Sequence, residues 1–273
     1  MSIAQINGQG IYFEDSGGNG PAIVFLHGFL MDQSLFDAQV EKLVSRYRCI
    51  RWDARGFGQT QWDGKPFNLY DSVSDCLGLM DHLNVGSAIL AGMSQGGYCA
   101  LRAALVAPKR VKALVLMSTR SGVDEEPLKA AYRGMRDAWK KKGPIPLLIE
   151  GFATGILGPK QAPGMETHWN QWLPRWNQIS GDAIFHTMNN LLDRDEISHR
   201  LTEITCPALV THGTEDNAIP PSLGEALSKA LANCKGFILA PGAHAVNLTH
   251  SEIINPPLVK FLDESVLKTL EPN

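Results

Sequence analysis

Residues 87–97 read SAILAGMSQGG, and this stretch decides which fold the rest of the chain has to fit. A short apolar run opens it, and an alanine-rich amphipathic segment at residues 98–107 follows it. Between them, residues 92–96 (GMSQG) match the pattern G-x-S-x-G with Ser94 at the centre. Small residues two positions on either side of a serine leave room for a sharp, strained turn from a strand into a helix. The stretch therefore predicts a strand, a tight turn and a helix.

This turn makes Ser94 a candidate nucleophile. The turn would raise the Ser94 hydroxyl above the end of the strand and set it at a helix N-terminus, where backbone amides favour developing negative charge. The pattern alone is weak evidence because it is short and built from common residues, and a serine in an ordinary tight turn is the alternative. The strand before it and the helix after it favour the nucleophile.

Short apolar runs bounded by turn residues recur along the chain, as is typical of strands covered on both faces of a parallel sheet. They lie at residues 22–26, 47–52, 87–91, 111–117, 208–211 and 237–240. Amphipathic stretches between them predict helices at residues 34–45, 71–83, 98–107 and 222–231. Two extended segments, at residues 3–7 and 11–15, predict an N-terminal hairpin. The alternation predicts an α/β fold, with a twisted, mostly parallel sheet flanked by helices.

The alternation stops between residues 121 and 200, which contain no clear strand and much of the tryptophan. We expect a core domain made of residues 1–120 and 201–273, with residues 121–200 forming a helical cap, or lid, over one end of the sheet. Trp169, Trp172 and Trp176 have the spacing of one helical face, and the first two are candidate substrate-binding residues. Packing of the cap onto the core explains the spacing equally well, and Pro174 predicts an interruption of that helix.

Composition and charge exclude several classes of protein. The net charge is -3, and residues 140–142 (KKK) form the only basic run, so a nucleic-acid partner is not expected. Five scattered cysteines without a C-x-x-C pair argue against a disulfide framework or a zinc site. No apolar run approaches the ~20 residues that span a bilayer, and the N-terminus lacks the pattern of a signal peptide. We expect a cytoplasmic protein without metal, cofactor or membrane partner, and homo-oligomer formation stays open.

A serine nucleophile needs a general base, because its hydroxyl does not ionise at neutral pH. His244 lies in a turn-rich loop after the last apolar run, and Asp216 follows the preceding run. The carboxyl ends of parallel strands meet at one edge of the sheet, so both side chains are expected to converge on Ser94. The order serine, acid, histidine is typical of a triad whose nucleophile occupies this kind of turn. The sequence thus predicts a Ser94–His244–Asp216 triad.

Other residues compete for the roles of acid and base. Asp124 and Glu125 follow another predicted strand and are the main alternative acid. Glu215 is adjacent to the predicted acid but would point in a different direction. His250 is expected at the start of the last helix, as a surface or capping residue. His212 lies at a strand end, where a packed histidine is the better interpretation.

With these residues in view, the chain resembles the α/β-hydrolase superfamily over nearly its whole length. Four landmarks match in order: residues 27–29 (HGF), residues 53–58 (DARGFG), the serine turn, and the acid followed by the histidine. The resemblance implies an oxyanion hole formed by the backbone amides of Phe29 and Gln95, with the Phe29 side chain near the mouth of a substrate pocket. It also implies that His27 and the DARG stretch shape loops around the site.

Within that superfamily, the chain resembles the small, cofactor-free esterases and lactonases that include 3-oxoadipate enol-lactonases. Residues 243–247 (AHAVN) and 192–196 (LDRDE) carry this finer likeness. The C-terminal stretch departs from the usual G-H-x-x-x-x-E-x-P form, because Ala243 replaces the glycine and the acid and proline come later, at Glu252 and Pro256. The resemblance implies hydrolysis of a small-molecule carboxylic ester or lactone through an acyl-enzyme.

Several other functions are weighed against ester hydrolysis. A carbon–carbon bond hydrolase acting on a dienoate-type substrate and a perhydrolase would use the same triad. A ligand receptor that keeps the pocket but turns over little belongs to a different class. A dehalogenase or epoxide hydrolase would need a carboxylate at position 94. A dinucleotide-binding protein is disfavoured, because no G-x-G-x-x-G opens a helix after the first parallel strand.

Overall fold

The computed structural model describes residues 2–268, which build an eight-stranded sheet of order β1-β2-β4-β3-β5-β6-β7-β8. The hairpin of β1 and β2 pairs antiparallel with β4, and every later neighbour in the order is parallel. The strands are β1 (Ser2–Ile6), β2 (Gln9–Asp15), β3 (Ala22–Leu26), β4 (Arg48–Trp52), β5 (Ala88–Met93), β6 (Val111–Met117), β7 (Ala208–Gly213) and β8 (Cys234–Ala240). The α/β fold with a mostly parallel sheet is therefore confirmed.

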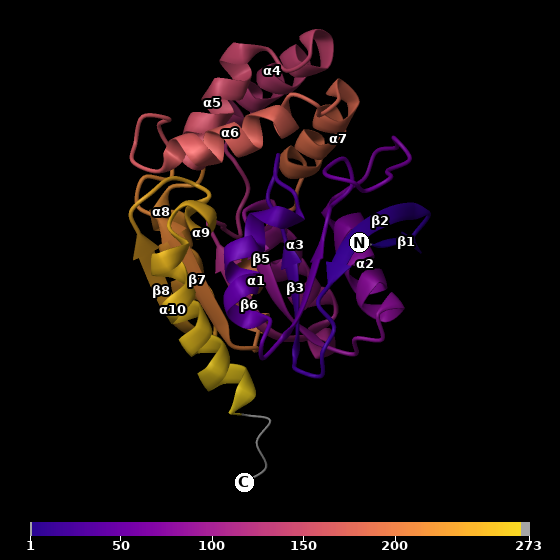
Figure 1. Cartoon of the computed structure of the whole chain (residues 1–273), viewed down its shortest axis with the longest axis vertical. Coiled ribbons are helices and arrows are strands. Elements are labelled where there is room, and N and C mark those ends of the chain that lie inside the picture. The colour runs from indigo at the N-terminus through magenta and orange to yellow at the C-terminus, as the bar shows by residue number, and fades with distance from the viewer. Residues whose placement is uncertain (1, 269–273) are drawn as a thin grey trace.

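The central strands read as continuous apolar runs because their alternate side chains enter two different cores. In β3, Val24 belongs to one buried cluster, and Ile23 and Phe25 belong to the other. The helices α2 (Leu69–His82), α3 (Gln95–Val106) and α8 (Pro221–Ala230) contribute to the first core. The helices α1 (Asp37–Leu43) and α10 (Ser251–Leu262) contribute to the second core, on the opposite face (Figure 1). Short elements complete the connections: η1 (Gln33–Phe36), η2 (Pro108–Arg110), η3 (Ser198–Glu203), α9 (Val246–Thr249) and η4 (Asp263–Leu267).

Four helices are inserted between β6 and β7: α4 (Glu126–Lys142), α5 (Pro146–Leu157), α6 (Met165–Trp176) and α7 (Gly181–Leu192). Figure 1 shows them gathered at one end of the molecule, beyond the end of the sheet. The interruption expected at Pro174 does not occur, because α6 continues to Trp176. Pro174 lies in the last turn, where its missing N–H removes one backbone hydrogen bond without ending the helix.

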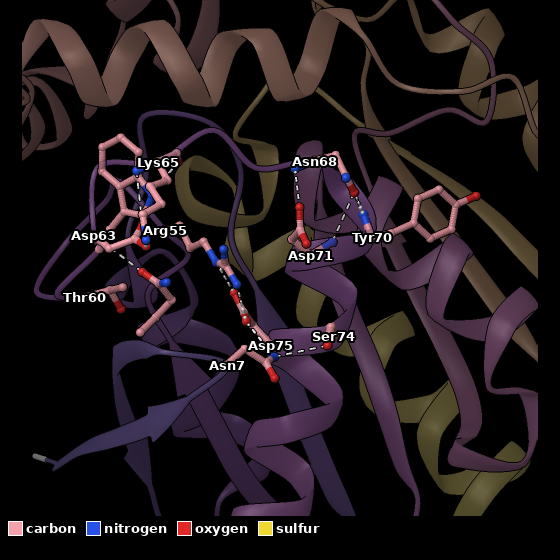
Figure 2. A network of polar contacts seen from close by, with 12 residues as sticks. Asn7, Arg55, Thr60, Asp63, Lys65, Asn68, Tyr70, Asp71, Ser74 and Asp75 are labelled. Atoms are coloured by element: carbon pink, nitrogen blue, oxygen red, sulfur yellow. Dashed lines mark hydrogen bonds and ion pairs between the residues drawn. The ribbon is translucent and has the colours of Figure 1, made fainter.

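The loop that follows β4 is fastened to the rest of the core by buried polar contacts (Figure 2). Arg55 donates from Nε and Nη2 to the two carboxylate oxygens of Asp75 on α2, at 2.6 and 2.8 Å. The Asn7 amide from the N-terminal hairpin donates to the same carboxylate at 2.9 Å. The helix itself begins with a capping box between Asn68 and Asp71. Loop, hairpin and helix are thereby held in one arrangement beside the carboxyl edge of the sheet.

No helix within residues 2–268 is long and apolar enough to cross a membrane. Across the same described part of the chain, no group of three or more histidine, cysteine, aspartate or glutamate side chains is arranged to hold a metal ion.

Candidate active site

Ser94 occupies a strained turn between β5 and α3. Its backbone has φ 51° and ψ -114°, a conformation that costs an L-residue roughly 1–3 kcal/mol. A Cβ atom at Gly92 would lie 2.3 Å from the Gly96 carbonyl oxygen, and one at Gly96 would lie 1.9 Å from that of Leu26. Both positions therefore require glycine, for the steric reason that the G-x-S-x-G spacing predicts. The strand runs directly into the turn, so α3 begins at Gln95 and not at Tyr98 as expected.

Besides the helical bond from Tyr98 N to the Ser94 carbonyl, two hydrogen bonds tie the backbone of Ser94 to the end of β6 and the residues after it. Ser94 N donates to the Met117 carbonyl at 2.9 Å, which ties the turn to the end of β6. The Thr119 hydroxyl donates to the Ser94 carbonyl at 2.9 Å, and Thr119 is fully buried. Sequence reasoning missed Thr119, because it lies after a neighbouring strand and no pattern in the sequence links it to Ser94.

His244 and Asp216 form a buried pair at the carboxyl ends of β8 and β7. The His244 Nδ1 atom lies 2.7 Å from Asp216 Oδ2, and the two residues are 6% and 3% exposed. A carboxylate only accepts hydrogen bonds, so Nδ1 carries the proton and the lone pair is left on Nε2. The loop is also tied to α5, because Ala245 N donates to the Ile156 carbonyl at 2.7 Å.

The pKa of Asp216 is held well below its usual range. Burial by itself would raise this pKa. The charge of His244 and hydrogen bonds from His212, His244 and the backbone of Ile219 together lower the pKa by more than burial raises it. Oδ1 accepts from the backbone N–H groups of Ala218 and Ile219, both at 2.9 Å. Asp216 is therefore ionised at neutral pH and its orientation is fixed by contacts from its own loop.

The structure places the competing residues in other contacts. Asp124 is paired with Arg120 and Arg194, each at 2.8 Å. His212 is fully buried at the end of β7, as expected of a packed histidine, and it also contacts Asp216. His250 precedes α10 and its Nδ1 lies 3.0 Å from the Thr249 hydroxyl. Glu125 and Glu215 are exposed.

Ser94 and His244 line the same cavity, which has a volume of about 90 Å³. Two kinds of side chain complete its wall. The apolar ones are Phe29, Phe152, Ile156, Met188, Leu191, Leu192, Ala218 and Ile219, and the polar ones are Tyr98, Asp124, Tyr132 and Arg194. Several of the apolar residues come from α5 and α7, so the inserted helices close the cavity over the carboxyl edge of the sheet.

The two residues expected to form an oxyanion hole lie on either side of the serine turn. Phe29 lines the cavity, and its ring packs edge-on against Phe57 and Phe152, with centroids 5.7 and 6.0 Å apart. Gln95 is the first residue of α3, and it lines a separate small pocket together with Leu26 and Cys99. Neither backbone N–H donates to an acceptor within residues 2–268. Both donors are therefore free, Gln95 because it opens α3 and Phe29 in the turn that follows β3.

Trp169 and Trp172 do not belong to the cavity wall that surrounds Ser94. The Trp169 indole N–H donates to the Gly158 carbonyl at 3.0 Å, and Trp172 packs against Trp176 with ring centroids 6.4 Å apart. These indoles share one face of α6, as their spacing predicts, but this face is buried in the second core. Their placement is that of cap packing, and side chains of α5 and α7 occupy the wall instead.

The comparisons with known proteins agree with this architecture. Residues 21–144 match the family model described as the alpha/beta hydrolase fold. An esterase from Thermogutta terrifontis superposes with a TM-score of 0.86 at 24% identity, covering 93% of both chains. The enol-lactonase from Burkholderia xenovorans LB400 superposes with a TM-score of 0.88 at 22% identity, covering 95% of this chain and 99% of that one. A bromoperoxidase from Bacillus anthracis reaches 0.82 at 22% identity, covering 93% and 96%.

At such identities the superpositions show the fold of this chain and do not identify a substrate. The family match covers the serine turn and all of α4, and it ends before β7 and β8, which precede Asp216 and His244. The superpositions cover 93% and 95% of this chain. This chain has the α/β-hydrolase fold.

Proposed function

We propose that this protein is a serine hydrolase that cleaves a small carboxylic ester or lactone through an acyl-enzyme. One observation carries the proposal: His244 and Ser94 line the same cavity. His244 is joined to the buried Asp216 at 2.7 Å, and Ser94 occupies the strained turn. This combination of a nucleophile, a base of fixed tautomer and a buried ionised acid is what acyl transfer requires.

In the first step Ser94 Oγ attacks the carbonyl carbon of the substrate while His244 Nε2 takes its proton. Asp216 keeps the imidazole in the productive tautomer and stabilises its protonated form. The free backbone N–H groups of Phe29 and Gln95 are the donors for the oxyanion, and one such donor is typically worth about 3 kcal/mol of barrier. Collapse of the tetrahedral intermediate breaks the carbon–oxygen bond, and His244 gives its proton to the departing alkoxide.

In the second step water attacks the carbonyl carbon of the acyl-enzyme. His244 takes a proton from that water and returns it to Ser94 Oγ as the acid is released. The free enzyme is regenerated and no redox change occurs. All of the proton transfers run through one imidazole, so one cavity is sufficient for both steps.

We propose that residues 1–120 and 201–273 act as the catalytic core and residues 121–200 as a cap that selects the substrate. Phe152 and Ile156 on α5 and Met188 on α7 support this role, because they reach from the inserted helices into the wall around Ser94. With Phe29, they are the residues that we expect to contact the substrate. A cavity of about 90 Å³ fits a short acyl group better than a long one.

A second candidate is perhydrolysis, in which hydrogen peroxide replaces water in the second step and a peracid is released. The superposition on the bromoperoxidase from Bacillus anthracis favours this candidate. Both candidates share the acyl-enzyme, so they differ only in which nucleophile takes the acyl group.

The first experiment compares hydrolysis of p-nitrophenyl acetate and butyrate by the wild type and by Ser94→Ala. We expect turnover by the wild type only, and covalent labelling of the wild type by a fluorophosphonate. Equal rates in the two proteins would remove Ser94 from the mechanism. Labelling without turnover would favour a receptor, and peracid formation with added peroxide would favour perhydrolysis.

A further inference from the structure

One wall of the cavity is polar, and its residues are buried or half-buried. It consists of Tyr98 from α3, Tyr132 from α4, and the pair of Asp124 and Arg194 from the two chain segments that connect the inserted helices to the sheet. Tyr98 lies one helical turn beyond Ser94 on α3 and is 5% exposed. This wall therefore stands directly beside the proposed nucleophile.

The charged groups of this wall are already paired. Arg194 donates to Asp124 Oδ2 at 2.8 Å, to the Leu191 carbonyl at 2.7 Å, and twice to the Gly122 carbonyl, at 3.0 and 3.1 Å. Asp124 accepts from Arg120 as well. Little of the Arg194 guanidinium is left for a ligand, and the Asp124 carboxylate in the same wall opposes the approach of an anion.

The two phenol hydroxyls, by contrast, have no partner. Within residues 2–268, neither the Tyr98 nor the Tyr132 hydroxyl makes a hydrogen bond, and neither oxygen is among the buried polar atoms without a partner, so both stay open to the cavity that the two rings line. Arg194 lies over the face of the Tyr98 ring, 4.5 Å from its centroid, so the ring is fixed in place. Burial raises the pKa of both Tyr98 and Tyr132, so both hydroxyls keep their protons and can donate.

We propose that Tyr98 and Tyr132 bind an uncharged oxygen, a carbonyl or a hydroxyl, carried by the acyl part of the substrate. The inference rests on the proposed ester or lactone hydrolysis and names the substrate class of that same site. The acyl part is chosen because His244 has to reach the oxygen of the departing alcohol, which places the alcohol on the His244 side of Ser94. The wall beside α3 is then left for the acyl group.

Three ethyl esters of matched shape test the proposal: ethyl pentanoate, ethyl 4-oxopentanoate and monoethyl succinate. They carry at the same position a methylene, a carbonyl and a carboxylate. We expect kcat/KM to be about 10-fold higher for the oxo ester than for the pentanoate, as one or two added hydrogen bonds would give, and lowest for the succinate. Ethyl esters are used because activated esters hydrolyse spontaneously. They release no coloured product, so the acid that is formed is followed by pH-stat.

The decisive readout is the oxo-to-pentanoate ratio of kcat/KM measured within each variant. Tyr98→Phe and Tyr132→Phe should each lower this ratio by about 3–10-fold. Tyr70→Phe is the matched control, because the Tyr70 hydroxyl binds Asp195 outside the cavity, and its ratio should equal that of the wild type. A pair with the oxygen in the alcohol part, 2-methoxyethyl against butyl pentanoate, should give a ratio that the tyrosine variants do not change.

The outcomes separate this inference from the proposed function. Equal kcat/KM for all three esters, a preference for the succinate, or tyrosine variants with the wild-type ratio would overturn the inference while ester hydrolysis stands. A tyrosine effect confined to the alcohol pair would also overturn it. Failure to hydrolyse any ester, with no fluorophosphonate labelling of Ser94, would remove the proposed function and the inference together.

Discussion

His212 Nε2 lies 3.1 Å from Asp216 Oδ2, the same carboxylate oxygen that His244 contacts. Nε2 is also 2.8 Å from the Ile219 carbonyl, so both of its neighbours are acceptors and it must carry the proton. The other ring nitrogen, Nδ1, is buried without a partner. His212 therefore contacts Asp216 only through Nε2, in addition to the contacts that Asp216 receives from its own loop.

Replacing His212 tests this second contact. We expect His212→Phe to lower the free energy of unfolding by about 1–3 kcal/mol, because two buried acceptors lose their donor. The kcat/KM for ester hydrolysis should fall about 3–10-fold, since Asp216 is then held less firmly. Urea unfolding and steady-state kinetics measure both effects. His212→Gln, whose side-chain amide supplies a donor, should recover most of each loss, and equal defects in the two variants would argue that only the ring shape matters.

The lowered pKa of Asp216 makes a prediction about stability and pH. A carboxyl whose pKa is lower in the folded than in the unfolded state stabilises the fold above its unfolded pKa, about 3.9 for aspartate. This contribution is lost as the pH falls from there toward the lower folded pKa. The free energy of unfolding of the wild type should therefore exceed that of Asp216→Asn at pH 7, and the difference should shrink below pH ~4. Glu215→Gln, which removes an exposed carboxylate next to Asp216 in the sequence, is the matched control variant.

The turn glycines predict a large steric effect. In Gly96→Ala the new methyl group would lie 1.9 Å from the Leu26 carbonyl, and backbone atoms cannot give way by that amount. We expect a loss of about 3 kcal/mol or more in stability, or no folded protein. Gly134→Ala is the matched control, because a methyl group there meets no atom within 4 Å on the exposed side of α4. It should raise the melting temperature slightly through helix propensity. A stable, active Gly96→Ala protein would contradict the described turn.

The contact between Thr119 and Ser94 predicts a link between a buried hydroxyl and activity. Thr119→Val keeps the shape but leaves the Ser94 carbonyl without the 2.9 Å donor. Stability should fall by about 1–3 kcal/mol, and kcat should fall with it because the strained turn is held less firmly. Thr119→Ser retains the donor and should keep kcat near that of the wild type. Identical kcat values in the two variants would mean that the turn does not depend on this bond.

Local patterns in the sequence were sufficient for the sheet and the serine turn. The residues of β3 and β6 were predicted to the residue, because a strand buried on both faces has a local apolar signature that needs no knowledge of its neighbours. The turn was visible because Gly92 and Gly96 meet backbone atoms close in space, which excludes any side chain whatever the context. Both features can be predicted from the sequence because each depends only on residues within a short segment of the chain.

The details that depend on how elements face one another were not predictable in this way. The spacing of Trp169 and Trp172 fixed their common face, but packing of α6 against the second core decided where that face points. Likewise, the packed position of His212 was expected. Its contact with Asp216 was not, because it depends on how the loop after β7 folds back to bring the Asp216 carboxylate beside His212. The pairing of Asp124 with two arginines removed it as a rival acid only once residue 194 was placed beside it.

The residues of the inserted helices divide into those that line the cavity and those that are buried in the packing of these helices. Phe152 lies in the wall beside Ser94, whereas Trp172 is fully buried in the packing of the cap. Phe152→Ala should enlarge the cavity, so the ratio of kcat/KM for p-nitrophenyl hexanoate to that for the acetate should rise several-fold. Trp172→Phe should lower stability, by about 1–3 kcal/mol, and leave that ratio at the wild-type value, because it removes buried contacts away from the substrate. A changed chain-length preference in Trp172→Phe, with none in Phe152→Ala, would return the substrate wall to α6.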